Sequence, residues 1–415
     1  MNRILRLFAL ILAGEMIYGL AFHVPRFFRP TLLEGFDLTN TQLGDMFAAY
    51  GVVAAISYLL GGPFADRFST RVLICTSLLL TAAGGFYMAT IPSPLEMTAL
   101  YALWGFSTSF LFWAALIKAT RDWGGNLSQG RAFGFLDGGR GLAAAVLATI
   151  AVAILKLYLP EDDSLITDTD RRVALRNIIL YYSVIAMTCA AIVWALVPHD
   201  ESTVSTDRNP YVGLMEAAPR PVVWAQAMII ICAYCGYKGI DNYALYATQV
   251  LGLREAMASE LASYGAYIRP IACVLAGYCA DRYFDSARSI LWMFAALTVS
   301  YVVLATVTPD TVAVTIIFAS AIVTYFAVFG LRGIYYALLE ETRIPKHLTG
   351  ASVAIIAFVG YLPDAFFGPI TGRILDANPG VQGHLDYFAF LAAVASAGIL
   401  VTLWLIWLKR RDAAN

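Results

Sequence analysis

The sequence predicts an all-α membrane protein in which twelve transmembrane helices form two pseudo-symmetric six-helix bundles. The first observation is the composition: the 415 residues are 60% hydrophobic and 14% charged, with a mean hydropathy of +0.69. Soluble domains contain about 45–50% apolar and about 25% charged residues. The second observation is a series of apolar runs of roughly 20 residues, the length that crosses a bilayer. The third is a short motif that occurs once in each half of the chain.

Proline, glycine and charged residues bound each predicted span. The spans cover residues 4–23, 41–62, 71–91, 96–119, 131–157, 174–197, 222–249, 257–280, 288–308, 311–336, 349–374 and 385–408. The longest polar connections are residues 158–173 and 198–221. Because the second follows the sixth span, we expect an N-terminal six-helix bundle at 1–197, a cytoplasmic linker at 198–221 and a C-terminal six-helix bundle at 222–415.

Basic residues predict how the chain is oriented in the membrane. The loops on the side of the two termini hold roughly twice as many lysines and arginines as the opposite loops, which favours cytoplasmic termini. Arg3 and Arg6 precede an apolar run as in a signal peptide, but Glu15 interrupts this run and no small-residue cleavage site follows. We therefore expect a monomeric, multi-pass protein of the inner (cytoplasmic) membrane, surrounded by lipid.

The composition and the motif search exclude several functions. A net charge of −1 lacks the basic excess of a nucleic-acid-binding surface. The six cysteines lie in apolar stretches, and Cys232 and Cys235 lack the further ligands of a zinc site. We expect the four histidines to be solvated residues at span ends without metal-ligand spacing: His23, His199, His347 and His384. No P-loop or hydrolase motif is present, so we expect no cofactor, no metal and no enzymatic activity.

One motif marks the same position in both halves. Residues 62–67 (GPFADR) follow the second span, and residues 277–282 (GYCADR) follow the eighth. A weaker repeat joins spans four and ten, where Lys118 corresponds to Glu340. Parallel repeats of six spans, with a binding site where they meet, are a known plan of transporters.

The repeated G-x-x-x-D-R motif resembles the signature loop of the major facilitator superfamily, and the twelve spans with a long middle loop extend this resemblance over the whole chain. The first copy departs from the fuller family pattern at Ser69 and Thr70, where glycine and a basic residue are usual. Residues 130–141, 333–337 and 360–364 are similar to uncharacterised bacterial permeases near the organophosphate, sugar-acid and organosulfonate carriers. The resemblance implies the MFS fold and small organic anions as substrates.

The signature motif has a physical interpretation as a gate. Gly62 permits close approach of helices, and Asp66 can accept hydrogen bonds from a helix end or pair with Arg71. Such a clasp would hold the two halves together on the cytoplasmic side in the outward-open state. The alternatives are a loop ion pair without a switching role and, for Lys118, extension to the membrane interface. The predicted gating residues are Gly62, Asp66, Arg67, Arg71, Gly277, Asp281, Arg282, Lys118 and Glu340.

Ionisable residues inside the predicted spans are the candidates for function. They are Glu15, Asp137, Asp241, Asp364, Lys118, Arg140, Lys238, Arg269 and Arg332. Each costs about 2.5–3.5 kcal/mol in the middle of the membrane, so they must pair or line a wet cavity. Spacing of i to i+3 pairs Asp137 with Arg140, and Lys238 with Asp241. Each pair is either functional or a structural bridge that fixes the rotation of its helix.

Arg269 and Arg332 have no acid nearby in the sequence, and tyrosines flank both. A guanidinium group donates two parallel hydrogen bonds to a carboxylate, sulfonate or phosphate. The alternative for Arg332 is an ion pair with Asp364 or Asp241 from another helix. The bases within the spans outnumber the acids, which favours an anionic ligand. The predicted substrate-binding residues are Arg269, Arg332, Lys238, Arg140, Tyr234, Tyr267, Tyr335 and Tyr336.

Acidic residues in the spans are candidates for proton coupling. A carboxyl group that alternates between wet and dry surroundings gains and loses a proton. Glu15 is either such a relay or a static partner of an arginine, and Asp364 either a relay or the anchor of a kink after Pro363. The predicted proton-coupling residues are Glu15, Asp364, Asp241 and Asp137.

The sequence thus predicts a secondary active transporter that moves a small organic anion by alternating access, coupled to protons. One alternative is a facilitator or exporter of drugs or cations, for which we would expect an excess of acids in the spans. A membrane-embedded receptor or enzyme is the other alternative. It would need a large extramembrane domain or a catalytic constellation, and the sequence shows neither.

Overall fold

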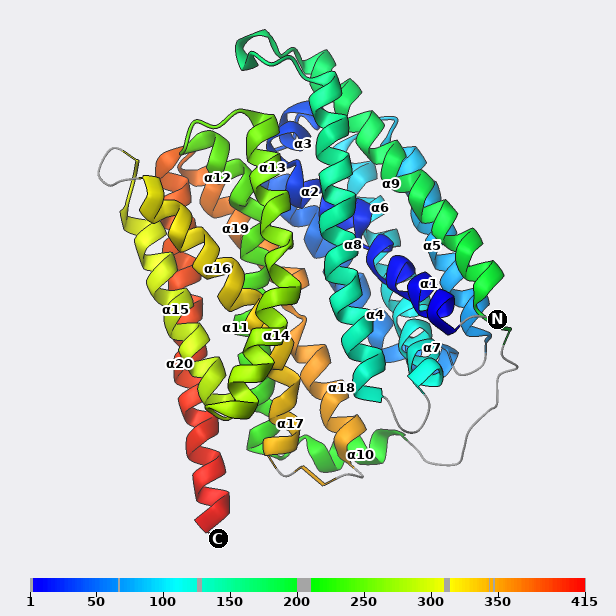
Figure 1. The fold of residues 1–415 in the computed structure, drawn as a ribbon, viewed down its shortest axis with the longest axis vertical. Coiled ribbons are helices and arrows are strands. Elements are labelled where there is room, and N and C mark those ends of the chain that lie inside the picture. The colour runs from blue at the N-terminus through cyan, green and yellow to red at the C-terminus, as the bar shows by residue number, and fades with distance from the viewer. Residues whose placement is uncertain are drawn as a thin grey trace. The chain divides into compact units, whose positions relative to one another are not determined.

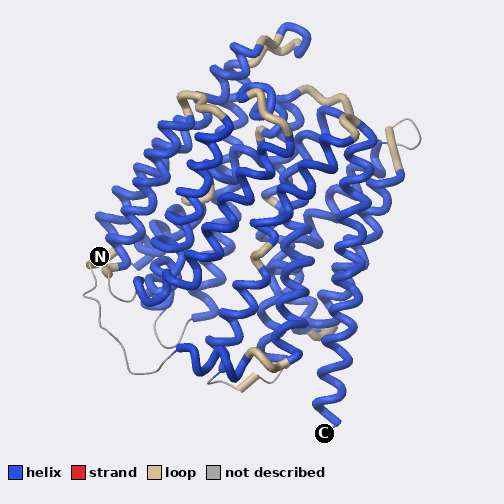
Figure 2. Tube along the Cα trace, turned by 180° about the vertical axis from the view of Figure 1, so that it is seen from behind, coloured by secondary structure: helices blue, strands red, loops and turns tan. Residues whose placement is uncertain are grey.

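The computed structural model describes residues 3–65, 68–124, 129–199, 210–309, 314–342, 344–345 and 348–414. These residues form helices joined by short loops, and no strand occurs among them (Figures 1 and 2). Nine helices in the described ranges are long and apolar enough to cross a membrane, and a bent pair near the N-terminus raises the number to ten. Each of the twelve predicted spans coincides with helix, which confirms the all-α membrane fold.

The first six spans are helical as follows. Span one contains α1 (Arg3–Met16), the π-helix η1 (Gly19–His23), α2 (Val24–Phe27) and α3 (Arg29–Phe36), and spans two and three are α4 (Asn40–Ala65) and α5 (Thr70–Met88). Span four contains α6 (Pro94–Phe106), the π-helix η2 (Ser107–Trp113) and α7 (Ala114–Gly124). Spans five and six are α8 (Gln129–Tyr158) and α9 (Asp168–Leu196), with the turn η3 (Asp163–Leu165) between them.

The second half begins with α10 (Pro210–Ala217), which lies before span seven. Span seven is α11 (Pro221–Gly239), η4 (Ile240–Asn242) and α12 (Tyr243–Gln249), and span eight is α13 (Glu255–Ala266) with α14 (Ile268–Arg282). Spans nine and ten are α15 (Ser286–Thr306) and α16 (Val314–Ile334), followed by η5 (Tyr335–Ala337) and α17 (Leu338–Glu341). Span eleven is α18 (Thr349–Gly360) with α19 (Pro363–Ala377), and span twelve is α20 (Val381–Ala414).

Local sequence explains where several helices begin. Ser93 and Glu96 form a capping box before α6, and Thr167 and Asp170 form another before α9. In each box, a hydroxyl and a carboxylate bond the backbone N–H groups that the first helical turn leaves without partners. Pro221 occupies the first turn of α11, where its missing N–H has no cost.

The chain divides into two compact units that do not follow the sequence halves exactly. Unit 1 contains residues Met1–Ser205, Asp241–Tyr267 and Asp364–Arg373, and unit 2 contains Thr206–Ile240, Ile268–Pro363 and Ile374–Asn415. Within the second half, three boundaries fall at the helix break η4, at Tyr267 and at the start of α19, and a fourth lies inside α19 between Arg373 and Ile374. The ends of three spans of the second half therefore pack with the first six spans.

Within unit 1, α4 packs against α6, α5 against α9, and α1 against both α8 and α9. The segments from the second half join this core, because α13 packs along α8 and α12 packs against α3 (Figure 1). Fully buried rings such as Trp104, Tyr101 and Phe112 fill its interior. Within unit 2, α15 packs against α20 and α16, and α11 packs against α20 and α18.

Candidate functional site

Arg332, in the last turn of α16, lies among tyrosine rings of unit 2. Its guanidinium carbon is 3.8 Å from the centre of the Tyr237 ring and 5.8 Å from that of Tyr234. An aromatic face attracts a cation at these distances. The Nη1 atom of Arg332 is buried and has no hydrogen-bond partner, and no carboxylate pairs with this residue in the described part of the chain. Among the described residues, the guanidinium group of Arg332 therefore faces aromatic rings instead of a carboxylate.

Tyrosine hydroxyl groups extend this cluster. The Tyr361 hydroxyl oxygen lies 3.2 Å from the hydroxyl oxygens of both Tyr335 and Tyr336. The Tyr234 ring packs edge-on against Tyr361 at 5.0 Å and stacks on Tyr237 at 5.7 Å. We call this set the arginine–tyrosine cluster: Arg332, Tyr234, Tyr237, Tyr335, Tyr336 and Tyr361. It offers a cation, hydroxyl groups and ring faces to a ligand.

Helix breaks position these tyrosines. The chain leaves α16 at Ile334 and tightens into the 3₁₀ turn η5, which carries Tyr335 and Tyr336. Tyr361 ends α18, before Pro363 starts α19. The sequence analysis identified Arg332, Tyr234, Tyr335 and Tyr336 but missed Tyr237 and Tyr361. The signal for Tyr237 was its spacing of three from Tyr234, which places both on one helix face.

The other predicted substrate residues of the second half are Lys238, Arg269 and Tyr267. Lys238, in the last turn of α11, is 2% exposed, and Arg269, in the first turn of α14, is 6% exposed. Tyr267 belongs to unit 1, where its hydroxyl oxygen lies 3.0 Å from Oγ1 of Thr149. The helix break at Tyr267 thus divides Tyr267 and Arg269 between the two units. Pro270 is tolerated because it lies in the first turn of α14.

A second group of buried charges lies in unit 1 and centres on Glu15. Nε of Arg140 donates to Oε2 of Glu15 at 3.1 Å, and Nε2 of His23 lies 3.1 Å from Oε1. The predicted pair of Asp137 and Arg140 is present at 3.6 Å, with Asp137 half-exposed. The rings of Tyr18 and Trp113 lie 5.5 and 5.7 Å from the Arg140 guanidinium carbon. Glu15 and Asp137 thus share one arginine.

The expectation for two of the histidines was wrong. His23 and His384 are 2% and 0% exposed instead of solvated, whereas His199 is exposed and His347 lies outside the described residues. His23 is buried because the first span continues as helix beyond residue 23. We call Glu15, His23 and Arg140 the Glu15 triad.

Asp241 has a partner that the sequence analysis did not anticipate. Nε of Arg26 donates to Oδ1 of Asp241, and both side chains are buried within unit 1. Lys238 lies in the last turn of α11 and Asp241 in the 3₁₀ turn η4, and their predicted pairing stays a prediction. Arg26 and Arg29 follow the first predicted span and fall in its connection to the second, but they are 8% and 5% exposed and lie in α2 and α3. Asp364 lies in the first turn of α19 and packs against Gly51, where an added Cβ would meet the Asp364 carbonyl carbon.

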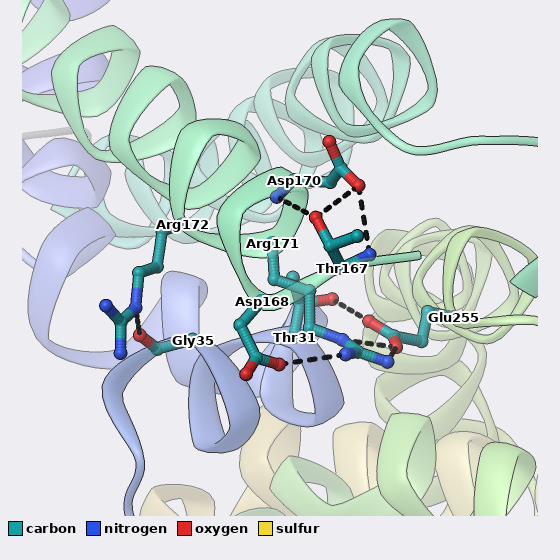
Figure 3. A network of polar contacts seen from close by, with 8 residues as sticks. All are labelled: Thr31, Gly35, Thr167, Asp168, Asp170, Arg171, Arg172 and Glu255. Carbon is teal, nitrogen blue, oxygen red and sulfur yellow. Dashed lines mark hydrogen bonds and ion pairs between the residues drawn. The ribbon is translucent and has the colours of Figure 1, made fainter. Parts of the chain in front are cut away.

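Glu255, the first residue of α13, anchors a network at one end of unit 1 (Figure 3). Its Oε1 accepts from Nε and Nη2 of Arg171 at 2.8 and 2.7 Å, and its Oε2 accepts from the Thr31 hydroxyl at 2.9 Å. Asp168 lies 3.5 Å from Arg171. We call Thr31, Arg171 and Glu255 the Glu255 network. It joins the first and sixth spans to the eighth.

The predicted gate residues are only partly described by the structure. Asp66, Arg67 and the side chain of Glu340 lie outside the described residues, so the clasp stays a prediction. Gly62 lies in α4, and Arg71 stacks on Trp194 at 4.5 Å and donates to its carbonyl oxygen at 3.4 Å. Gly277 has open space where a Cβ would stand, Asp281 and Arg282 are exposed, and Lys118 is half-buried.

An ion-pair group that was not predicted lies near the end of α14. Nζ of Lys409 donates to Asp285 at 3.2 Å and to Glu341 at 2.6 Å.

Comparisons with known proteins agree with this architecture. Two inner membrane proteins of Escherichia coli strain K12 are similar to the chain: YihN, 26% identical over 96% of this chain and 94% of its own length, and YqcE, 24% identical over 90% and 88%. The nucleoside transporter NupG has the same fold, with a TM-score of 0.72 at 11% identity over 98% of this chain and 99% of its own. A bacterial homologue of the lysosomal transporter Spinster, solved inward-facing and unoccupied, gives 0.70 at 14% identity, covering 98% of this chain and 96% of its own.

The sequence family is shown by a direct match. A sequence model of the Major Facilitator Superfamily matches residues 11–368, which is most of the chain. The relatives are membrane proteins, and both solved neighbours are transporters, so the family indicates transport and not enzymatic catalysis. The expected fold of twelve helices agrees with these neighbours. The chain therefore belongs to the major facilitator superfamily.

Proposed function

We propose that this protein is a secondary active transporter that carries a small organic anion across the inner membrane by alternating access, coupled to protons. The observation that carries the choice of an anion is Arg332, which lies against Tyr237 with no carboxylate partner in the described part of the chain. A buried cation without an acid partner is costly in a membrane protein unless a ligand or water completes its surroundings. A carboxylate, a sulfonate or a phosphorylated compound would supply the missing charge.

The geometry of the arginine–tyrosine cluster suits such a ligand. Stacking on Tyr237 uses the face of the guanidinium plane, and hydrogen bonds to an oxyanion use its edge. The Nη1 atom, which is buried without a partner, lies on this edge. Tyrosine hydroxyl groups and ring faces beside it can bind the remainder of the molecule. The cluster thus supports an organic anion over a bare inorganic one.

The experiment is a ligand screen on the purified protein by thermal shift. The panel contains carboxylates, sulfonates, phosphorylated sugars and amino-acid conjugates, with organic cations as the alternative class. Affinity for the binding anion should fall by about 1.5–3 kcal/mol in Arg332→Lys, which keeps the charge but loses the planar fork. Arg332→Ala should abolish binding. Stabilisation by organic cations alone would favour the exporter alternative.

Two controls separate binding from structure in this screen. Arg411 also lies over an aromatic ring, Trp407 at 5.3 Å, but at the end of α20 away from the cluster, so Arg411→Lys should leave affinity unchanged. Asp364→Asn neutralises the acid that the sequence offered as a partner of Arg332. If Arg332→Ala binds normally once Asp364 is neutral, Arg332 was an ion-pair residue, and the anion site must be sought at Lys238 or Arg140.

Proton coupling is supported by the Glu15 triad. Glu15 is 3% exposed in the first span, and an arginine and a histidine both contact its carboxylate. A buried carboxylate whose cationic partner moves away binds a proton in compensation. In proteoliposomes, Glu15→Gln should retain anion exchange but lose accumulation driven by a pH gradient. Equal loss of both activities would assign Glu15 to binding or folding instead.

Alternating access is supported by the Glu255 network, which would have to separate when that end of the protein opens. The orientation we propose follows the distribution of basic residues, with both termini in the cytoplasm and the Glu255 network outside. A reporter that is active only in the cytoplasm should be active when it is fused after Asn415. Activity only of a reporter that works outside the cytoplasm would reverse the proposed orientation.

A further inference from the structure

His23 contacts Glu15 because the first span is bent. An α-helix would place residues eight apart about 12 Å apart along its axis. Here α1 and the segment Gly19–Phe27 meet at 43°, and the wider π-helix η1 carries His23 at its end. Gly19 permits this arrangement, since an added Cβ would lie 2.8 Å from Tyr182 and 3.0 Å from Met16. The bend thus brings a second titratable group onto the buried carboxylate, and π-turns of this kind are frequent at functional sites.

The surroundings of His23 define its proton state in this structure. Its Nδ1 atom is buried and has no hydrogen-bond partner among the described residues, while Nε2 faces Oε1 of Glu15. An imidazolium would leave a buried N–H donor unsatisfied at Nδ1, so the neutral ring with its hydrogen on Nε2 fits best. Arg140 already supplies a positive charge to Glu15 at 3.1 Å. The negative charge of Glu15 is therefore compensated by a contacting cation as long as Arg140 stays in place, and Asp137 shares that cation.

We propose that Glu15 and His23 together hold the transported proton, and that they take it up when Arg140 withdraws from Glu15 during the transport cycle. This inference rests on the proposed function and adds His23 to its coupling machinery. A hydronium ion donates the proton either to a Glu15 carboxylate oxygen or to Nδ1 of His23, and its own O–H bond breaks to leave a water molecule. No other covalent bond changes.

The groups around the pair are consistent with this exchange. Tyr18 lies in the bend itself, and Tyr182 of α9 packs edge-on to His23 at 6.1 Å. From α8, Arg140 contacts Glu15, and Asp137 lies beyond Arg140. The helix α7, which also packs on α1, carries Lys118, Arg121 and Asp122. Arg140 is the cation whose contact with Glu15 the structure shows, so its departure changes the charge of the pair by one.

The test needs no substrate, because Arg140→Gln imitates the departure of the arginine. The apparent melting temperature of the purified protein is measured from about pH 5 to about pH 9, the range in which histidine and buried carboxyl groups titrate. Arg140→Gln should melt below the wild type at high pH and recover as the pH falls. The proton raises stability below the titration midpoint of the folded protein, and this gain is lost as the pH rises through that midpoint.

His23→Gln in the Arg140→Gln chain isolates the role of the histidine. Glutamine still donates an N–H to Glu15 but cannot hold a proton, and the proton affinity of a pair is the sum over both sites. We expect the pH midpoint of the recovery in melting temperature to fall by at least about one unit, which corresponds to a tenfold higher proton concentration. His384→Gln, at another buried histidine outside the triad, should leave the midpoint unchanged. Recovery at the same pH with and without His23 would overturn the proposal.

Glu15→Gln in the Arg140→Gln chain is the folding control. This double variant carries no buried charge at the triad, so it should match the wild type at every pH. If it folds while Arg140→Gln does not recover at low pH, the proposal is wrong. If neither variant folds, the infrared bands of the imidazole and carboxyl groups are titrated in the wild type, in His23→Gln and in Glu15→Gln. Identical titration in all three proteins would contradict the proposal that Glu15 and His23 share the proton. The experiment uses no substrate, so a failed anion screen would not affect its outcome.

Discussion

Arg171 and Glu255 form an ion pair of 2.7 Å that joins α9, in the first half of the chain, to α13, in the second half. Their side chains are 18% and 10% exposed, so the pair is shielded from solvent. Removal of one member of a shielded pair leaves an uncompensated charge, whereas exposed pairs contribute little. Unit 1 also contains an exposed ion pair, between Arg373 and Asp45, whose side chains are 57% and 47% exposed. We expect that pair to contribute less to stability than the pair of Arg171 and Glu255.

The first prediction is that Glu255→Gln favours opening at this end of the protein. Arg171 would keep only weaker interactions with Glu34 and the exposed Asp168, so the closed arrangement should lose about 1–3 kcal/mol. The measurement is the labelling rate of a cysteine at Ser259, which is 0% exposed, with a membrane-impermeant maleimide in a chain without other cysteines. We expect at least a tenfold increase in rate, since about 1.4 kcal/mol changes a population ratio tenfold.

Arg172→Lys is the matched control for Glu255→Gln. Arg172 follows Arg171 on α9, but its Nε donates to the Gly35 carbonyl oxygen at 3.1 Å within the first half of the chain. Its replacement should not change labelling at position 259. Equal labelling in Glu255→Gln and the wild type would show that the Glu255 network does not hold this end closed.

The second prediction concerns a close contact between α4 and α19. A Cβ on Gly44 would lie 2.2 Å from the Gly368 carbonyl oxygen, and no side-chain rotation relieves a clash with backbone. Gly44→Ala should therefore force the two helices apart and lower the melting temperature by several degrees, as overpacking of about 1–3 kcal/mol would. Gly138→Ala, where nothing lies within 4 Å of the added Cβ, should be neutral. Similar melting temperatures for the two variants would contradict this packing.

Local patterns in the sequence predicted part of these sites. Arg332 with Tyr335 and Tyr336, and Asp137 with Arg140, lie within one helical turn of each other, and spacing is sufficient to pair such residues. The apolar runs likewise predicted the nine or ten helices of the described residues that are long and apolar enough to cross a membrane, because the length that crosses a bilayer is fixed. The functional family followed from the repeated motif and was then shown by the match over residues 11–368.

The remaining contacts depend on tertiary structure that no local pattern carries. Arg26 and Asp241 are 215 residues apart, and Arg140 and Glu15 are 125 apart. Their pairing depends on which helix faces meet. His23 was misjudged because a π-helix has no simple sequence signal, so the first span seemed to end where it only bends.

The third prediction is a pH dependence at Asp285, which lies just before α15. Although partial burial raises its pKa, the Arg288 backbone N–H and the Lys409 ammonium hold the pKa of Asp285 below its ordinary value. Ionised Asp285 therefore stabilises the fold at neutral pH, and this contribution is lost as the pH falls through the pKa of the folded state. Asp285→Asn keeps the helix cap but removes the charge. Its melting temperature should be lower than that of the wild type at neutral pH, and the difference should shrink in acid. A difference that is constant with pH would assign the loss to packing.

The fourth prediction tests the hydroxyl groups of the arginine–tyrosine cluster. Tyr361→Phe keeps the ring against Tyr234 but removes the hydroxyl that lies 3.2 Å from both Tyr335 and Tyr336. Affinity for the anion identified by thermal shift should fall by about 0.5–1.5 kcal/mol, the net value of a neutral hydrogen bond. Tyr301→Phe is the matched control, because it removes a buried hydroxyl that donates to the Gly236 carbonyl oxygen at 3.3 Å. It should lower the melting temperature and leave affinity unchanged. If both variants bind as the wild type does, the hydroxyl groups only hold the helix breaks in place, and Arg332 alone recognises the anion.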